Sequence, residues 1–255
     1  METSDIRFSD GQFVLLVTGA SKGLGRALCE AWAAPGARIA LAARGAAGLE
    51  ATANRLRAQG ADVFAAAGDV SDPGFAEHLV RGAEDALGPV THLVTCASSL
   101  GAVPLRPIAD VEDAAWEEAI GTNILGTVRL WRAVLGRMEG SLGGGRLLHV
   151  SSDAAAAAYP HWGPYGATKA AVDHLVRILA AEFEAHRVEN VFAYAVDPGD
   201  MDTDMHRAAI PDADPEQLLS PAAVAPALRS LLLQDPPLPS GRYLAAEIAT
   251  GSARR

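Results

Sequence analysis

Three side chains near the middle of the chain have the types and spacing needed for proton transfer. Tyr165 and Lys169 form a Tyr-x-x-x-Lys pair, and Ser152 precedes them in the same stretch. Residues four apart share a helix face, so the lysine can lie near the tyrosine hydroxyl. A cation about 4 Å away favours a phenolate by roughly 4 kcal/mol at an effective dielectric of ~20. We therefore expect Lys169 to depress the pKa of Tyr165 toward neutrality, with burial opposing part of that effect.

A glycine-spaced turn, Thr18–Gly25, lies between an apolar strand and a helix early in the chain. Glycine is needed where a chain turns sharply and where its backbone approaches a pyrophosphate closely. The start of the following helix adds free N–H groups and partial positive charge. This turn predicts a dinucleotide site, and together with the tyrosine and lysine it indicates hydride transfer to or from a carbonyl.

The end of the second expected strand indicates which dinucleotide is bound. A carboxylate there would accept hydrogen bonds from a ribose 2′-hydroxyl, but Arg38–Ala43 ends without one and Arg44 follows. Lys22 supplies a second cation in the glycine turn. Two cations suit a 2′-phosphate, so NADP(H) is the preferred cofactor and NAD(H) the alternative.

Short apolar runs alternate with helical patterns along the whole chain, which is typical of a parallel sheet covered on both faces. We expect an α/β fold: a single doubly wound, Rossmann-like domain over residues 1–255, with about seven parallel strands and helices on both faces. The expected strands are Phe13–Val17, Arg38–Ala43, Asp62–Ala67, His92–Cys96, Arg146–Val150, Val191–Val196 and Arg242–Leu244. The expected helices are Leu24–Ala34, Leu49–Gln59, Pro73–Leu87, Asp113–Met138, Pro164–His186 and Pro221–Leu233.

The turn spacing Gly-x-x-x-Gly-x-Gly resembles that of the short-chain dehydrogenase/reductase family, and further family landmarks follow in order. They are Asp69-Val70 after the third strand, Asn123 in Thr-Asn-Ile-Leu-Gly, the Ser152, Tyr165 and Lys169 set, and Pro198-Gly199 followed by Thr203. The resemblance implies that Ser152 hydrogen-bonds the substrate oxygen and that Lys169 also holds the nicotinamide ribose. It further implies that Asn123 anchors a water-mediated proton path.

One family landmark differs. Where the family usually has Asn-Asn-Ala-Gly, this chain has Thr95-Cys96-Ala97-Ser98. Ala97 is kept and Ser98 is small enough to lie beneath a ribose, but the lost asparagine amide leaves the local hydrogen bonding open. We interpret Cys96 as a packed small residue rather than a redox group.

The candidate site residues divide into three groups. The catalytic set is Asn123, Ser152, Tyr165 and Lys169. Expected cofactor contacts are Gly19, Ser21, Lys22, Gly23, Leu24, Gly25, Arg44, Asp69, Val70, Ala97, Tyr165, Lys169, Pro198, Gly199 and Thr203. Expected substrate contacts are Ser152, His161, Trp162, Met205 and His206, within or near a substrate loop at about 200–220. Asp200, Asp202 and Asp204 are interpreted as a solvated loop, so no metal site is expected.

Composition excludes several classes of function. The net charge of −10 argues against a nucleic-acid partner, and no apolar stretch is long enough for a membrane span. Met1–Asp5 is too acidic and polar to begin a secretory signal. With only Cys29 and Cys96, a reducing, cytoplasmic setting is expected. The apolar positions Val172, Leu175, Val176, Leu179 and Phe183 pack either the sheet or a second subunit, and the resemblance implies a homodimer or homotetramer.

The sequence thus predicts an NADP(H)-dependent oxidoreductase acting on a small carbonyl or alcohol, with Tyr165 as general acid and base. Two alternatives stay open. One is epimerase or dehydratase chemistry on a nucleotide sugar, since relatives share Tyr-x-x-x-Lys. The other is a nucleotide-binding redox sensor that does not catalyse, for which the altered Thr95–Ser98 segment is the support.

Overall fold

The computed structural model describes residues 13–141 and 143–253. The prediction made for Met1–Asp5 falls outside these ranges. Within them, no helix is both long and apolar enough to cross a membrane.

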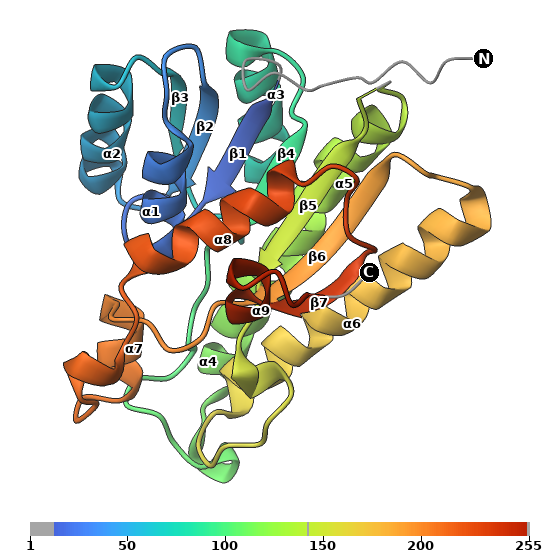
Figure 1. The fold of residues 1–255 in the computed structure, drawn as a ribbon. Coiled ribbons are helices and arrows are strands. Elements are labelled where there is room, and N and C mark those ends of the chain that lie inside the picture. Colours follow the sequence, from blue (N-terminus) through green and yellow to red (C-terminus); the bar gives the residue numbers. More distant parts are fainter. Residues whose placement is uncertain (1–12, 142, 254–255) are drawn as a thin grey trace.

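A seven-stranded, all-parallel sheet with the order β3-β2-β1-β4-β5-β6-β7 forms the centre of the fold (Figure 1). Its strands are β1 (Val14–Thr18), β2 (Arg38–Ala43), β3 (Asp62–Ala67), β4 (His92–Thr95), β5 (Gly145–Val150), β6 (Val191–Asp197) and β7 (Gly241–Leu244). The predicted α/β class and strand number are confirmed. Chain order reverses between β1 and β4, where the connections diverge to opposite faces and open a crevice at the carboxyl ends of the strands.

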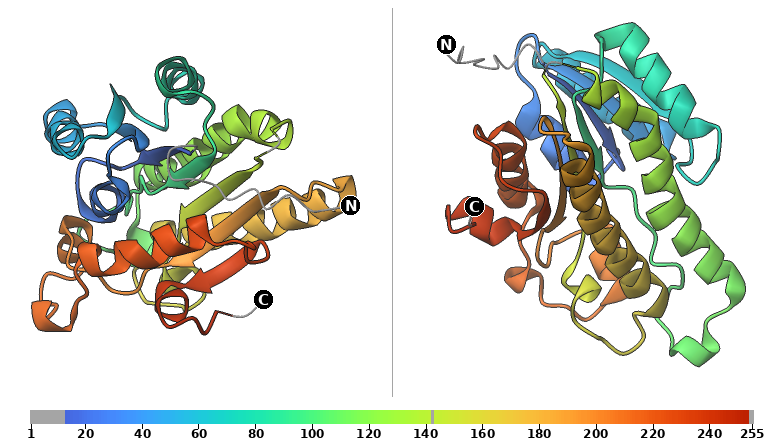
Figure 2. Two further views of the ribbon diagram at one scale, coloured as in Figure 1. Left: turned by 45° about the horizontal axis from the view of Figure 1, so that its top comes forward. Right: turned by 90° about the vertical axis from the view of Figure 1, so that its right-hand side faces the viewer.

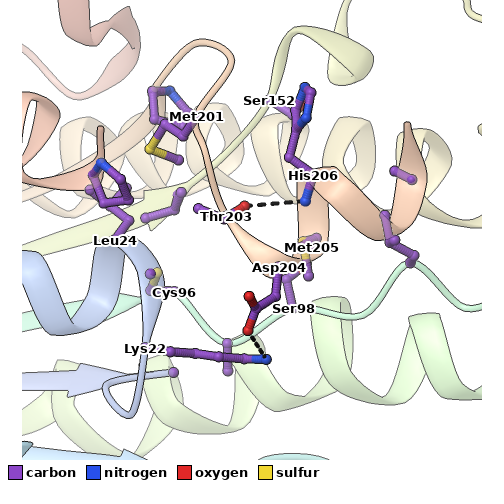
Figure 3. A pocket seen from close by; sticks show the side chains of 18 of the residues that line it. Lys22, Leu24, Cys96, Ser98, Ser152, Met201, Thr203, Asp204, Met205 and His206 are labelled. Atoms are coloured by element: carbon purple, nitrogen blue, oxygen red, sulfur yellow. Dashed lines mark hydrogen bonds and ion pairs between the residues drawn. The ribbon is translucent and has the colours of Figure 1, made fainter. Parts of the chain in front are cut away.

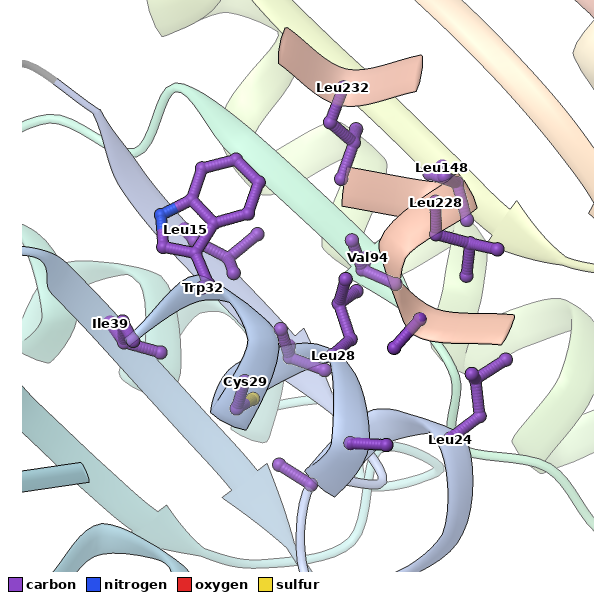
Figure 4. Packing of buried hydrophobic residues seen from close by; sticks show 14 of the residues in the cluster. Leu15, Leu24, Leu28, Cys29, Trp32, Ile39, Val94, Leu148, Leu228 and Leu232 are labelled. Atoms are coloured by element: carbon purple, nitrogen blue, oxygen red, sulfur yellow. The ribbon is translucent and has the colours of Figure 1, made fainter. Parts of the chain in front are cut away.

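Helices cover both faces of the sheet, as two views show (Figure 2). On one face lie α1 (Gly23–Trp32), α2 (Ala46–Ala58) and α8 (Pro221–Leu233), and on the other lie α3 (Phe75–Leu87), α5 (Thr127–Glu139) and α6 (Gly163–His186). Successive residues of a strand point to opposite faces of the sheet. Leu15 therefore packs with Leu28 of α1 and Leu228 of α8 (Figure 4), while Leu16 packs toward the helices on the other face. The α6 positions Val172, Val176 and Phe183 pack against this chain's own sheet.

The predicted long helix Asp113–Met138 is helical throughout but not uniform. It consists of α4 (Asp113–Ala119), a π-helical segment, η3 (Ile120–Gly126), and α5. Periodicity alone does not distinguish these forms. Two short helices were also not predicted, α7 (Asp204–Ala209) and α9 (Ala245–Ala249), because five or six residues carry too little periodic pattern.

The π-helical segment carries Asn123, whose side chain is fully buried and forms hydrogen bonds at both ends. Its Nδ2 donates to the Ser99 carbonyl (2.9 Å) and to Thr168 Oγ1 (2.8 Å), and its Oδ1 accepts from Ser99 N (2.8 Å) and Ser98 Oγ (3.1 Å). Asn123 therefore ties the segment after β4 to helix α6. It acts as a structural tether: it connects the segment that carries Ser98 to the helix that carries Lys169.

Replacing Asn123 by alanine should destabilise the fold, because it leaves Ser99 N, the Ser99 carbonyl and Thr168 Oγ1 buried without this partner. We expect a loss of about 2–4 kcal/mol in the free energy of unfolding, measured by urea denaturation. Asn190→Ala is the matched control, since Asn190 donates one side-chain bond, to the Ser141 carbonyl, and should cost about 1 kcal/mol. Equal losses in the two variants would contradict the tether.

Candidate active site

A cavity of about 960 Å³ opens at the carboxyl ends of the strands. Its wall brings together the glycine turn, the residues after β2 to β6, part of α6 and the segment around α7. The predicted site residues in the wall are Gly19, Ser21, Lys22, Gly23, Leu24, Arg44, Asp69, Val70, Ala97, Ser152, Trp162, Tyr165, Lys169, Pro198, Gly199, Thr203, Met205 and His206. Gly25, Asn123 and His161 are not part of the wall among the described residues. His161 is exposed, which does not favour the substrate contact expected for it.

The glycine turn is packed too tightly for any other residue at two points. Gly19 has φ +70°, and a Cβ there would lie 2.9 Å from Ala97 N; a Cβ on Gly25 would lie 2.6 Å from the Gly19 carbonyl oxygen. Gly25 therefore supports the turn from behind. Helix α1 then begins after Lys22, which is in extended conformation and whose side chain does not cap the helix. The first backbone amides of the helix can receive a phosphate.

The two cations predicted to hold a 2′-phosphate both lie in the cavity wall and are exposed. Lys22 Nζ pairs with Asp204 Oδ2 at 2.9 Å (Figure 3), and Arg44 Nη1 lies 4.0 Å from Asp69 Oδ2. Exposed pairs of this kind contribute little stability and exchange readily for another anion. Asp69 is itself held by Ser71: partial burial raises the pKa of its carboxyl, but hydrogen bonds from Ser71 N and Oγ outweigh this and lower it.

Ser152 and Tyr165 contribute neighbouring hydroxyls to the cavity, and the Ser152 hydroxyl hydrogen-bonds the tyrosine. The Ser152 hydroxyl proton is donated to Asp153 Oδ1 (2.9 Å), and Ser152 Oγ accepts from Ala154 N (3.2 Å). Alternation along a strand would turn Ser151 away from the side of Ser152, but both serines line the cavity because β5 has already ended at Val150. The Ser151 hydroxyl is buried and has no partner among the described residues.

Lys169 lies on the buried side of Tyr165 and is 2% exposed. Its Nζ donates to the Val150 carbonyl at 2.7 Å and lies 5.4 Å from the centroid of the tyrosine ring. Burial lowers the pKa of Lys169 to about 8, against the opposing influence of Cys96 and Asp173.

The structure does not show the expected depression of the Tyr165 pKa. Burial raises the pKa of Tyr165 above its ordinary value, and the hydrogen bond from Ser152 offsets only part of this. The sequence argument placed a cation about 4 Å from the hydroxyl. In the structure the ammonium is directed to the Val150 carbonyl instead, and desolvation of the phenolate dominates.

The altered segment Thr95–Ser98 keeps its position through other hydrogen bonds. Thr18 Oγ1 accepts from Cys96 N and Ala97 N, both at 3.2 Å, and Asn123 holds Ser98. The Cys96 side chain lines the cavity, and burial raises the pKa of its thiol to about 11. A protonated thiol fits the interpretation of Cys96 as a packed small residue.

The outer part of the cavity combines apolar walls with a carboxylate. Leu100, Ala154 and Tyr165 form a small cluster against which Trp162 and Met205 pack, and the Trp162 and Tyr165 ring centroids lie 5.6 Å apart. Sequence reasoning missed Leu100, whose signal is its place just beyond the carboxyl end of β4. It also missed Asp153, which accepts from Tyr159 Oη at 2.7 Å.

The acidic stretch that follows β6 forms ion pairs rather than a ligand cluster. Asp202 and Asp204 both pair with Arg207, and Asp204 also pairs with Lys22. Figure 3 shows Met201, Thr203, Met205 and His206 gathered along this segment, with Thr203 Oγ1 accepting from His206 N at 3.2 Å. In the described ranges, no group of three or more metal-ligating side chains is close enough to hold an ion.

Comparison with known proteins gives one consistent family. Residues 13–214 match the short chain dehydrogenase family. A short-chain type dehydrogenase/reductase of Picea abies is 31% identical over 202 residues, covering 76% of this chain and 73% of that protein. A glycine betaine reductase of Emericella nidulans is 34% identical over 192 residues, but the match spans 75% of this chain and only 15% of that protein. A Pseudocercospora fijiensis short chain dehydrogenase is matched over 60% of its length at 33% identity.

Solved structures agree with the sequence relatives. An alcohol dehydrogenase from Thermococcus sibiricus in complex with 5-hydroxy-NADP is 30% identical with a TM-score of 0.79, covering 91% of this chain and 95% of that one. A short chain dehydrogenase from Shigella flexneri in complex with NADP is 25% identical with a TM-score of 0.82, covering 92% and 97%. This chain belongs to the short-chain dehydrogenase/reductase family of oxidoreductases.

Proposed function

We propose that this protein is an NADP(H)-dependent oxidoreductase that interconverts a small carbonyl compound and its alcohol, with Tyr165 as the general acid and base. The observation that carries the proposal is that Ser152, Tyr165 and Lys169 lie together in the wall of one cavity. The glycine turn lines the same cavity. A bound nicotinamide cofactor supplies or accepts the hydride, and the protein supplies position and protons.

Each of these residues has a distinct role in reduction. The Ser152 hydroxyl hydrogen-bonds the carbonyl oxygen of the substrate, and the Tyr165 hydroxyl donates its proton to that oxygen. The raised pKa of Tyr165 keeps the phenol protonated before the reaction. Lys169, charged below its pKa of about 8, stabilises the phenolate left after proton transfer and holds the nicotinamide ribose. Asn123 supports this arrangement by fixing α6 against the segment after β4.

Cofactor preference rests on the charges at the far end of the cavity. Lys22 and Arg44 border the place expected for the adenosine ribose, and the carboxylate that would bind an unmodified 2′-hydroxyl is missing after β2. The glycine turn fits a dinucleotide, since Gly19 permits close approach of a ligand and the Lys22 side chain does not cap the start of α1. NADP(H) over NAD(H) is therefore our proposal, in keeping with relatives crystallised with NADP and 5-hydroxy-NADP.

The substrate is proposed to contact the apolar wall formed by Leu100, Trp162 and Met205, with His206 nearby in the loop at about 200–220. The unpaired cysteines Cys29 and Cys96 fit a reducing, cytoplasmic setting. We also propose a homodimer or homotetramer, for which exposed Leu125 on η3 and exposed Ile178 on α6 offer apolar surface.

Tyr165→Phe should lower kcat for carbonyl reduction by at least about 1000-fold, because the proton donor is lost while the cavity keeps its shape. NADPH binding, followed by fluorescence or thermal stabilisation, should change little. Tyr243→Phe is the matched control: its hydroxyl bonds the Pro239 carbonyl, and it should retain activity.

Assays of NADPH consumption with a panel of ketones, aldehydes, quinones, sugars and acyl-thioesters separate the remaining alternatives. Retained turnover in Tyr165→Phe would refute the proposed acid. NADPH binding by the wild type without turnover of any substrate would favour the redox sensor. Failure to bind either nicotinamide dinucleotide would refute the proposed function as a whole.

Reversing the charges in Lys22→Glu and Arg44→Glu should weaken NADPH binding by about 10- to 100-fold each, since each removes a charge-assisted contact to the 2′-phosphate. NADH binding should change by less than about threefold. Arg81→Glu, an exposed charge reversal on α3, controls for net charge. Equal losses for the two dinucleotides, measured by calorimetry, would contradict the preference.

A further inference from the structure

Arg242 on β7 joins three segments that carry the proposed site, although it does not itself line the cavity. Its Nε donates to Asp173 Oδ2 at 2.9 Å, and its Nη2 donates to Asp197 Oδ2 at 3.0 Å and to the Ser152 carbonyl at 3.1 Å. The three acceptors belong to α6, to the end of β6 and to the residue that carries the Ser152 hydroxyl. One planar guanidinium therefore bridges all three.

The bond to Asp173 reaches the helix of Tyr165 and Lys169. Asp173 follows Lys169 by one helical turn, and its side chain is only 8% exposed. Its other oxygen, Oδ1, has no partner among the described residues. Arg242 thus hydrogen-bonds a buried carboxylate on the same helix as the proposed catalytic pair.

The bond to Asp197 reaches the Pro198–Gly199 turn. Asp197 Oδ1 accepts from Gly199 N at 3.0 Å while Asp197 Oδ2 accepts from Arg242. Gly199 has φ +77° and lines the cavity. The orientation of this turn therefore depends on a carboxylate whose other oxygen is fixed by Arg242.

From this geometry we propose that Arg242 is a positioning residue: through Asp173, Asp197 and the Ser152 carbonyl it fixes the Ser152 hydroxyl, helix α6 and the Pro198–Gly199 turn relative to one another. The inference rests on the proposed function, since it concerns the alignment needed for that reaction. Productive geometry is demanding, because displacement of a catalytic group by about 1 Å can cost roughly 100-fold in rate.

An arginine suits this task better than a lysine or an apolar residue. Its rigid fork presents several N–H groups in fixed directions, so one side chain can set three oxygens at once. Buried ion pairs contribute little net stability compared with well-packed apolar residues. The placement of this network at the carboxyl edge of the sheet, beside the proposed site, points to alignment as its purpose.

The test compares Arg242→Met with Arg146→Met. Arg146, on β5 of the same sheet, donates to the carbonyls of Gly145 and Asn190 and stacks on Phe192, but at the opposite ends of the strands from the cavity. Both variants lose a half-buried arginine with several contacts. Arg242→Met should lower kcat by about 10- to 100-fold with the Kd for NADPH changed by less than about threefold, whereas Arg146→Met should keep the wild-type kcat.

Two further variants keep the proposal testable if Arg242→Met folds poorly. Arg242→Lys restores the charge without the fork and should have a kcat between those of Arg242→Met and the wild type. Asp173→Asn removes the link to α6 alone and should lower kcat less than Arg242→Met. Where Arg242→Met does fold, the double variant Asp173→Asn with Arg242→Met should have a kcat no lower than that of Arg242→Met, because Asp173 acts through Arg242.

Hydrogen exchange gives a readout that needs no turnover. Arg242→Met should speed amide exchange in the peptides covering 150–156 and 196–203, and Arg146→Met should not. A folded Arg242→Met with wild-type kcat, or with unchanged exchange in both peptides, would overturn the inference. If the wild type turns over no carbonyl, the proposed function fails, and the exchange measurement still decides whether Arg242 orders these segments.

Discussion

A lysine charge held out of water is the constraint on which the site depends. Lys169 is 2% exposed and donates to the Val150 carbonyl, and burial lowers its pKa to about 8. The same burial raises the pKa of Tyr165. Desolvation therefore outweighs the attraction between ammonium and phenolate, and Tyr165 is kept as a neutral phenol. Such a group is ready to donate a proton, which suits the reduction that we propose.

The fold makes this burial possible. Parallel strands place the carboxyl ends of β1 and β4 to β6 along one edge, and α6 crosses that edge with Tyr165 and Lys169 on the face toward the sheet. Asn123 holds α6 from the side of β4, and Arg242 holds it from the side of β7. Helix α6 is thus fixed at both flanks by a buried asparagine and a half-buried arginine, whose loss would leave their partners unsatisfied.

Much of this arrangement was predictable from local patterns. Alternating strand and helix signals gave the sheet class, and glycine spacing located the turn where Gly19 and Gly25 leave no room for a side chain. The π-helical segment around Asn123 was not predictable, because its periodicity over a few residues is close to that of an α-helix. Local sequence patterns also do not predict contacts between distant segments. Arg242 is an example, because its three hydrogen-bond acceptors lie far from it along the chain. The direction of the Tyr165 pKa shift was missed for the same reason, since burial and the aim of the Lys169 ammonium are set by tertiary packing.

The most direct test of this account is an ultraviolet titration of tyrosinate in the cofactor-free protein, taken as the difference between the wild type and Tyr165→Phe. The chain has four tyrosines, and the difference isolates Tyr165. The account predicts no Tyr165 phenolate signal below pH ~10, the ordinary pKa of a phenol. A one-tyrosine step near neutral pH would contradict it, because the lysine charge would then outweigh burial.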